Sequence, residues 1–232
     1  MSHMKDFLAS IYPQEKYQKL KEASFKQIRE FDRDARTKVS PAKSTWSDFY
    51  EQGTGKKIHK KLSLHLKAKQ NGYCCYCRDT IFHGANANIE HILPIKWYPM
   101  FAFTYYNFAL ACATCNALKS KDDWFKLDPI KIFYRKNSFG CFHPNLDDYD
   151  EHIELFSIRT NKLNVRTFVG KTPKGKKICN DLLSKVSVFS IKEQGSPVIA
   201  NTLNLVNKYL EENPGAADGK LEALTKRLFL NI

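Results

Sequence analysis

The sequence predicts an α+β fold in which a small module with short strands, held together by metal-bound cysteines, lies between mainly helical regions. Three observations support this class. Two Cys-x-x-Cys pairs bound the segment 74–115, short alternating or apolar runs lie between the pairs, and apolar residues recur at helical spacing outside them. We therefore divide the chain into a helical region over 5–70, a module over 71–127 and an α+β region over 128–232.

The charge balance favours a polyanionic partner. The 232 residues include 37 Lys and Arg against 24 Asp and Glu, which gives a net charge of +13 and a pI near 9.3. Nucleic acid is the obvious polyanion, although charge alone leaves an ordinary basic protein equally open. No apolar run approaches the roughly 20 residues that span a bilayer, and no signal peptide precedes the first helical pattern. We therefore expect a soluble, cytoplasmic protein with no membrane partner.

Helical periodicity dominates the region before the module. Apolar residues at spacings of three and four predict an amphipathic helix over 10–38 and a short helix over 45–52. Gly53 and Gly55 then predict a hinge-like turn. A further helix over 56–70 carries six lysines, which fit either contact with phosphates or an ordinary solvated face.

The cysteines predict a structural zinc site. Cys74 and Cys77 form one Cys-x-x-Cys knuckle, and Cys112 and Cys115 form a second one 38 residues further on (112 minus 74). Two such knuckles supply four thiolates to one tetrahedral ion, which leaves no open coordination position for chemistry. Seven cysteines is an odd number, so metal-bound thiolates in a reduced compartment explain the pattern better than a disulfide framework. The remaining three are expected to be core or bystander thiols: Cys75, Cys141 and Cys179.

Between the knuckles, two short strands are expected over 80–82 and 88–92. Glu90 and His91 are adjacent near the end of the second strand. A histidine beside a carboxylate fits a general base, because neutral imidazole is present near neutral pH and can take a proton from water. Taken alone, a histidine such as His91 is more often a structural residue with satisfied hydrogen bonds, so its interpretation depends on the surrounding sequence.

The surrounding sequence includes YNFALACATCNALK at 106–119, EHILP at 90–94 and the first cysteine knuckle. Over about residues 73–123 the chain resembles the HNH endonuclease family, in the zinc-containing branch that ends in Cys-x-x-Cys-Asn-x-x-Lys. The cysteine pairs, a histidine, two asparagines and a lysine all follow the family's order. The resemblance implies a ββα-metal module, in which two strands and a helix surround a catalytic divalent metal and the cysteine pairs clamp a separate zinc.

The resemblance also implies a role for each matching residue. His91 would activate water for attack on a phosphodiester, and Asn107 would brace the loop between the strands and orient the histidine. Asn116 stands where the family has its last histidine and Glu90 where it has aspartate or histidine, and both offer oxygen ligands that suit Mg or Mn. Lys119, one turn beyond Asn116, would either contact phosphate or lie on the helix surface. Weaker candidates for nucleic-acid contact are Arg78 and Lys96.

The region after the module contains further regular elements. Residues 119–126 are expected either to continue the helix of the module or to follow it, and a hairpin is expected over 153–159 and 163–169. Thr172-Pro173 predicts the start of a helix that ends near residue 186. The polar turn at 143–148 fits either an ordinary loop or a segment that approaches the site. Two more helices are expected over 196–210 and 220–229.

Together these observations predict a metal-dependent endonuclease that hydrolyses DNA phosphodiester bonds, with structural Zn and catalytic Mg or Mn. The alternative is a non-catalytic, zinc-stabilised nucleic-acid-binding module, for which two knuckles and positive charge suffice. Four residues distinguish the two, because a binding module needs none of them: Glu90, His91, Asn107 and Asn116. In its small size and helical flanks the chain is also similar to HNH nucleases of bacterial anti-phage systems of the Septu and retron type, which implies an ATPase partner protein. The sequence contains no ATP-binding loop of the Walker type.

Overall fold

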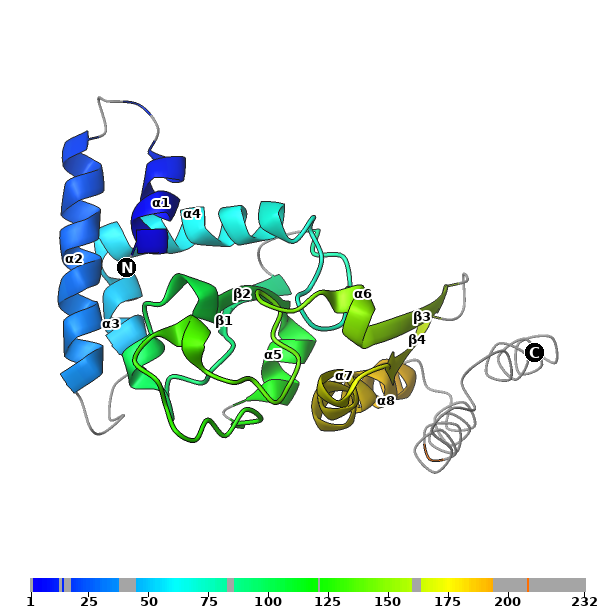
Figure 1. Cartoon of the computed structure of the whole chain (residues 1–232). Coiled ribbons are helices and arrows are strands. Elements are labelled where there is room, and N and C mark those ends of the chain that lie inside the picture. Colours follow the sequence, from blue (N-terminus) through cyan, green and yellow to red (C-terminus); the bar gives the residue numbers. More distant parts are fainter. Residues whose placement is uncertain are drawn as a thin grey trace. The chain divides into compact units, whose positions relative to one another are not determined.

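The structure is a computed structural model that describes residues 2–12, 14, 18–37, 45–82, 86–120, 122–159, 164–193 and 208. The chain divides into two compact units, one formed by Met1–Glu154 with Val169–Leu182 and the other by Leu155–Phe168 with Leu183–Ile232. The boundaries expected at 70/71 and 127/128 both fall inside the first unit. Helices and small two-stranded sheets are combined (Figure 1), which confirms the α+β class. Within these described ranges, no helix is both long enough and apolar enough to cross a membrane.

Helices form the start of the first unit (Figure 1), in the order α1 (Ser2–Ile11), α2 (Gln18–Thr37), α3 (Thr45–Glu51) and α4 (Gly53–Lys69). The helices expected over 45–52 and 56–70 are confirmed. The helix expected over 10–38 is confirmed over most of its length by α2, but its start is wrong, because α1 extends to Ile11 and α2 begins at Gln18. The end of α1 agrees with the sequence, since a proline at position 13 disfavours helical backbone at the residue before it. Each helix buries an apolar stripe; those of α2 and α4 contain Ile28, Ala35, Ile58, Leu62 and Leu66.

A tight corner joins α3 to α4. A Cβ atom at Gly55 would lie 1.8 Å from the carbonyl oxygen of Phe49, so only glycine lets the first turn of α4 pass this close to α3. A Cβ atom at Gly53 would meet nothing within 4 Å. The two glycines expected to form a hinge instead begin α4, and Gly55 serves close packing. The corner fixes α3 so that the rings of Trp46 and Phe49 contact Phe103 of the module.

The module consists of two strands and a helix. β1 (Ala87–His91) and β2 (Phe108–Cys112) are antiparallel, with Ile89 opposite Leu110 and His91 opposite Phe108, and α5 (Ala113–Lys119) packs against both strands. The strand expected over 88–92 is confirmed. The strand expected over 80–82 is wrong, because Thr80 makes only an isolated bridge to Tyr73, and β2 is the partner instead.

The chain turns away from helical geometry directly after α5. Ser120 has a φ of 53°, so the segment after Lys119 follows the helix and does not continue it, which is the second of the two expectations. The following segment contains the 3₁₀ turn η5 (Tyr134–Lys136) and the short helix α6 (Tyr149–His152), whose first turn is capped by the Asp148 carboxylate. These irregular segments return to the module and contribute residues to the site described below.

The expected pair of strands after the module is present as β3 (Ile153–Arg159) and β4 (Asn164–Gly170). Thr172 caps α7 (Pro173–Ile178) by accepting a hydrogen bond from the Gly175 amide, which confirms the predicted start of this helix. Instead of ending near residue 186, the helical path continues through a π-helical turn (Cys179–Leu183) into α8 (Ser184–Glu193). The helices expected over 196–210 and 220–229 lie outside the described residues, apart from Lys208.

Candidate functional site

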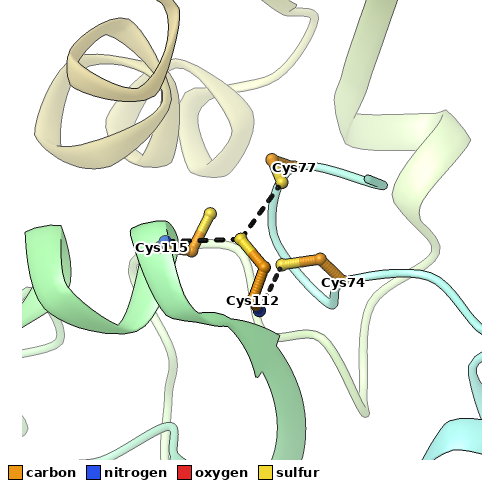
Figure 2. A group of neighbouring side chains, drawn as sticks. All are labelled: Cys74, Cys77, Cys112 and Cys115. Carbon is orange, nitrogen blue, oxygen red and sulfur yellow. Dashed lines mark hydrogen bonds between the residues drawn. The ribbon is translucent and has the colours of Figure 1, made fainter. Parts of the chain in front are cut away.

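Four cysteines from both knuckles converge on one point (Figure 2). Cys74 and Cys77 come from the turn after α4, Cys112 ends β2, and Cys115 lies in α5. Their sulfur atoms all lie within 4.8 Å of one another, and the Cys77 and Cys112 sulfurs are 3.7 Å apart. Zinc bound tetrahedrally at about 2.3 Å would separate its sulfur ligands by about 3.8 Å. The cluster could therefore hold one zinc ion, as the spacing of the cysteines predicts.

Backbone amides help to set the cysteine sulfurs in place. The Cys112 amide donates to the Cys74 sulfur over 3.3 Å, and the Cys115 amide donates to the Cys112 sulfur over 3.4 Å. Such bonds stabilise negative charge on thiolates. A hydrogen bond with Cys115 lowers the pKa of Cys112, whereas burial raises the pKa of Cys75 well above its usual value. Cys75 is therefore a core thiol, and its amide donates to the Leu110 carbonyl.

His91 ends β1 and is enclosed by aromatic rings. Only 9% of its surface is exposed, and the edges of Trp46 and Phe108 meet it at centroid distances of 5.0 and 5.1 Å. Its Nε2 atom lies 3.0 Å from the Ala102 carbonyl oxygen. Because a carbonyl only accepts hydrogen bonds, Nε2 carries the proton, and Nδ1 of the neutral ring keeps its lone pair. Burial lowers the pKa of His91 to about 3, so the ring is neutral at pH 7.

Glu90 leaves β1 on the face opposite to His91, as successive strand residues do. Its buried carboxylate forms an ion pair with the Lys119 ammonium and accepts a hydrogen bond of 3.4 Å from the Tyr76 hydroxyl. Burial raises the pKa of Glu90, although the charge of Lys119 opposes this shift. The carboxylate expected to bind a divalent ion is thus already neutralised by a lysine.

Lys119 lies inside the module. It is 1% exposed, and its ammonium also donates to the His91 carbonyl oxygen over 3.0 Å. One side chain therefore ties α5 to the end of β1. This position counts against both readings of Lys119 from the sequence, contact with phosphate and a place on the helix surface, because the ammonium is enclosed by groups of the protein.

Asn107 braces the loop that joins the strands. It is fully buried, and its Nδ2 donates to the carbonyls of Leu93 and Phe101 over 3.1 and 3.2 Å. Its Oδ1 accepts from the Leu93 amide over 2.7 Å and from the Tyr134 hydroxyl over 2.9 Å. All four hydrogen-bonding positions of the carboxamide are used. Asn107 thereby holds the chain next to Ala102, the residue that binds His91.

The other predicted site residues lie at the edge of this arrangement. Asn116 is half-buried on α5, one turn before Lys119. The Arg78 guanidinium lies 4.3 Å from the ring centre of Tyr149, and the ammonium of the exposed Lys96 lies 4.4 Å from that of Trp97. Of the three cations proposed to contact nucleic acid, Lys96 is the exposed one, Arg78 is half-buried and Lys119 is enclosed.

The structure also brings in residues that the sequence did not single out. Trp46 from α3 covers His91, and Tyr134 from η5 completes the bonds of Asn107. His143 and Asn145 belong to the polar turn at 143–148, for which the sequence left contact with the site open. The group of polar residues in that turn was the one sequence signal for a contact with the site. The sequence around Trp46 and Tyr134 does not indicate that they contact His91 and Asn107.

Comparison with family models, curated proteins and solved structures finds no match to this chain. The fold and the site by themselves define an α+β protein with a buried four-cysteine cluster that could hold zinc. The same module also contains a neutral histidine, an enclosed ion pair and a fully bonded asparagine.

Proposed function

We propose that this chain is a metal-dependent endonuclease of the HNH type that hydrolyses phosphodiester bonds in DNA. The observation that carries this proposal is the hydrogen bond between His91 Nε2 and the Ala102 carbonyl. It selects the neutral tautomer whose Nδ1 has a free lone pair, which is the form a general base needs. Nδ1 takes a proton from water as the water oxygen attacks phosphorus, the bond from phosphorus to the 3′ oxygen breaks, and that oxygen leaves and takes up a proton to become the 3′-hydroxyl.

The order of the elements supports the same class. β1, β2 and α5 follow one another as strand, strand and helix, the arrangement that the HNH resemblance implies, and the cysteine cluster includes residues of both β2 and α5. Asn107 lies in the loop between the strands, at the position for which the resemblance implies a bracing role. The net charge of +13 suits binding to a phosphate backbone.

The catalytic ion fits the described conformation only in part. Glu90 and Asn116 are the residues that would hold Mg or Mn, and a bound ion supplies stabilisation of negative charge on the leaving oxygen. The Glu90 carboxylate, however, is buried against Lys119, and Asn116 is the more accessible of the two. An ion at Glu90 therefore has to displace the Lys119 ammonium.

Water also has to reach His91. Trp46 and Phe108 cover the ring, and α3 is held in place by the corner at Gly55. The proposed reaction therefore requires α3 to move away from His91, and binding of DNA or of the ATPase partner that the anti-phage resemblance implies would supply the necessary free energy. A role in anti-phage defence is part of this proposal.

A non-catalytic, zinc-stabilised nucleic-acid-binding module is the second candidate, and the Glu90–Lys119 pair is the observation that favours it. In this view Glu90 and Lys119 join α5 to β1, His91 fills an aromatic pocket and Asn107 closes a loop. Each of these residues then has a structural task, and basic side chains on the surface bind nucleic acid without cutting it.

The deciding experiment incubates supercoiled plasmid with the zinc-loaded protein in magnesium, manganese or chelator. His91→Ala is compared with His65→Ala, which removes a histidine that instead contacts Phe7 and Tyr105. We expect metal-dependent nicking by the wild type and by His65→Ala, and a rate at least about 100-fold lower for His91→Ala, because general-base catalysis contributes about that much.

Binding to the same plasmid is measured in parallel for all three proteins. Intact binding without nicking under any metal would exclude a nuclease that acts alone, and would favour either a nuclease that needs its partner or the binding module. Equal cutting by His91→Ala and the wild type would show that His91 is not the base.

A further inference from the structure

A series of buried, hydrogen-bonded polar side chains leads from the segment after the module to Asn107 in the site. Tyr134 is largely buried, and its hydroxyl lies 2.9 Å from Asn107 Oδ1 and 2.8 Å from His143 Nε2. His143 is fully buried. Tyr134 and His143, which are nine residues apart, are thus joined by hydrogen bonds to Asn107, which lies 27 residues before Tyr134.

Every hydrogen bond in this series of side chains has a defined donor and acceptor. The Asn107 Nδ2 faces two carbonyls, so Oδ1 can only accept, and the Tyr134 hydroxyl must donate to it. The Tyr134 oxygen then accepts from Nε2–H of His143, while His143 Nδ1 accepts from the Asn145 amide over 3.2 Å. His143 is thus a neutral ring in one tautomer, in agreement with a pKa that burial lowers to about 3.

The far end of the chain is anchored as well. The His143 amide donates to Asp147 over 2.8 Å, and the other oxygen of Asp147 accepts from Lys174 over 2.7 Å. Asn145 donates to the carbonyls of Tyr106 and Phe108, the residues on either side of Asn107, over 3.0 and 2.7 Å. The turn at 143–147 therefore holds both the carboxamide of Asn107 and the backbone around it.

The near end leads to the proposed general base. Asn107 binds Leu93, two residues after His91, and Phe101, the residue before the Ala102 carbonyl that holds the imidazole. The ring of Tyr134 also meets the ring of Phe101 edge to face, with centroids 5.0 Å apart. Tyr134 thus fixes the same short segment through its hydroxyl and through its ring.

We propose that Tyr134 and His143 are positioning residues, which act through Asn107 to hold the Ala102 carbonyl and, with it, the imidazole of His91 in its reactive tautomer. This inference rests on the proposed function. Packing alone would be served by apolar side chains of similar size, whereas a network with every donor and acceptor paired selects one arrangement of the loop. Its expected effect is therefore on the rate of cleavage, and much less on DNA affinity.

The test is Tyr134→Phe, which keeps the ring and removes the hydroxyl. The matched control is Tyr149→Phe. Tyr149 is similarly buried, and its hydroxyl donates to the Tyr76 carbonyl over 3.0 Å, so it takes no part in the hydrogen bonds that join Asn107, Tyr134 and His143. We expect both variants to keep their zinc and to lose similar thermal stability. Only Tyr134→Phe should lower the cleavage rate at saturating DNA, by about tenfold, at unchanged affinity.

Nitrogen NMR of the His91 ring and hydrogen exchange of the Leu93 amide provide a readout that does not depend on cleavage. Tyr134→Phe should mix the two His91 tautomers and speed exchange at Leu93, whereas Tyr149→Phe should change neither. If the wild type fails to cut DNA, a nuclease that acts alone is excluded, and the NMR comparison still decides the positioning role. An unchanged His91 ring and Leu93 amide in Tyr134→Phe would overturn the inference, as would equal changes in the control.

A second pair of variants covers the case in which Tyr134→Phe does not fold. His143→Gln retains a side-chain N–H that can donate to Tyr134, whereas His143→Leu removes it. Positioning predicts that Gln preserves the His91 tautomer and the cleavage rate better than Leu does. Equal behaviour of the two variants would contradict it.

Discussion

Replacing Lys119 by methionine tests how deeply the pair with Glu90 is buried. The change keeps the length of the side chain but leaves a carboxylate without a cation in a buried position, and removing one partner of a buried ion pair costs about 3–5 kcal/mol. Glu90 can escape part of this cost by taking up a proton. That uptake costs about 1.4 kcal/mol for each pH unit above the unfolded value of about 4.3, or about 4 kcal/mol at pH 7.

The sign of the pH dependence follows from the same reasoning. Burial already raises the pKa of Glu90, and loss of Lys119 raises it further. A group with a raised folded-state pKa gives stability that is complete below its unfolded pKa and is lost as pH rises through the folded pKa. The pKa of Glu90 in the folded variant is therefore higher than in the folded wild type. Between these two pKa values the difference in stability between wild type and Lys119→Met should grow with pH, and above both it should stay constant.

Denaturant unfolding of the zinc-loaded protein between pH 6 and pH 8 measures both effects. The double variant Lys119→Met/Glu90→Gln should recover part of the loss and show no extra dependence on pH. As a control, Lys177→Met breaks a pair with Asp181 in which the side chains are 40% and 31% exposed, and should cost less than about 1 kcal/mol. A loss below about 1 kcal/mol for Lys119→Met, without pH dependence, would refute the view that this pair is desolvated.

Three further predictions concern packing, zinc and access to the histidine. Gly55→Ala should destabilise the protein by more than about 1 kcal/mol, since its Cβ would lie 1.8 Å from a carbonyl oxygen, while Gly53→Ala should be neutral or stabilising by thermal melting. Cys115→Ser should reduce zinc from about one ion per chain to well below that in elemental analysis, with loss of module structure in circular dichroism. Trp46→Ala should raise the pKa of His91 from about 3, followed by NMR titration, because the ring is no longer covered. A His91 pKa below its unfolded value of about 6.5 means that wild-type stability falls as pH drops below 6.5, and the fall should be shallower in Trp46→Ala.

Elements with a local signal could be predicted from the sequence. Thr172 before Pro173 gives the start of α7 directly, because the cap and the fixed φ of proline act within one turn. β1 has strand-like residues and a defined end. β2 was missed because its residues, FALAC, are an apolar run whose periodicity does not separate a buried strand from a buried helix.

The candidate site divides in the same way. The cysteine cluster follows from spacing, because two knuckles leave little choice of geometry. Lys119 resembles a surface lysine in sequence, and only the pairing of α5 with β1 places it against Glu90. Tyr134 and His143 lie 27 and 36 residues beyond Asn107 (134 and 143 minus 107), and contacts between such irregular segments have no periodic signature.

Cys112 unites tasks that are usually separate. Its sulfur belongs to the cluster and accepts the hydrogen bond from the Cys115 amide that caps α5. Cys112 is also the last residue of β2, opposite Ala87, and it is the one cysteine of the four that is not fully buried. An oxidant arriving from solvent therefore meets Cys112 first, and a sulfenic acid there would remove a metal ligand and a helix cap in one event. Oxidation of this single sulfur atom would therefore weaken the end of β2 and the start of α5 at the same time.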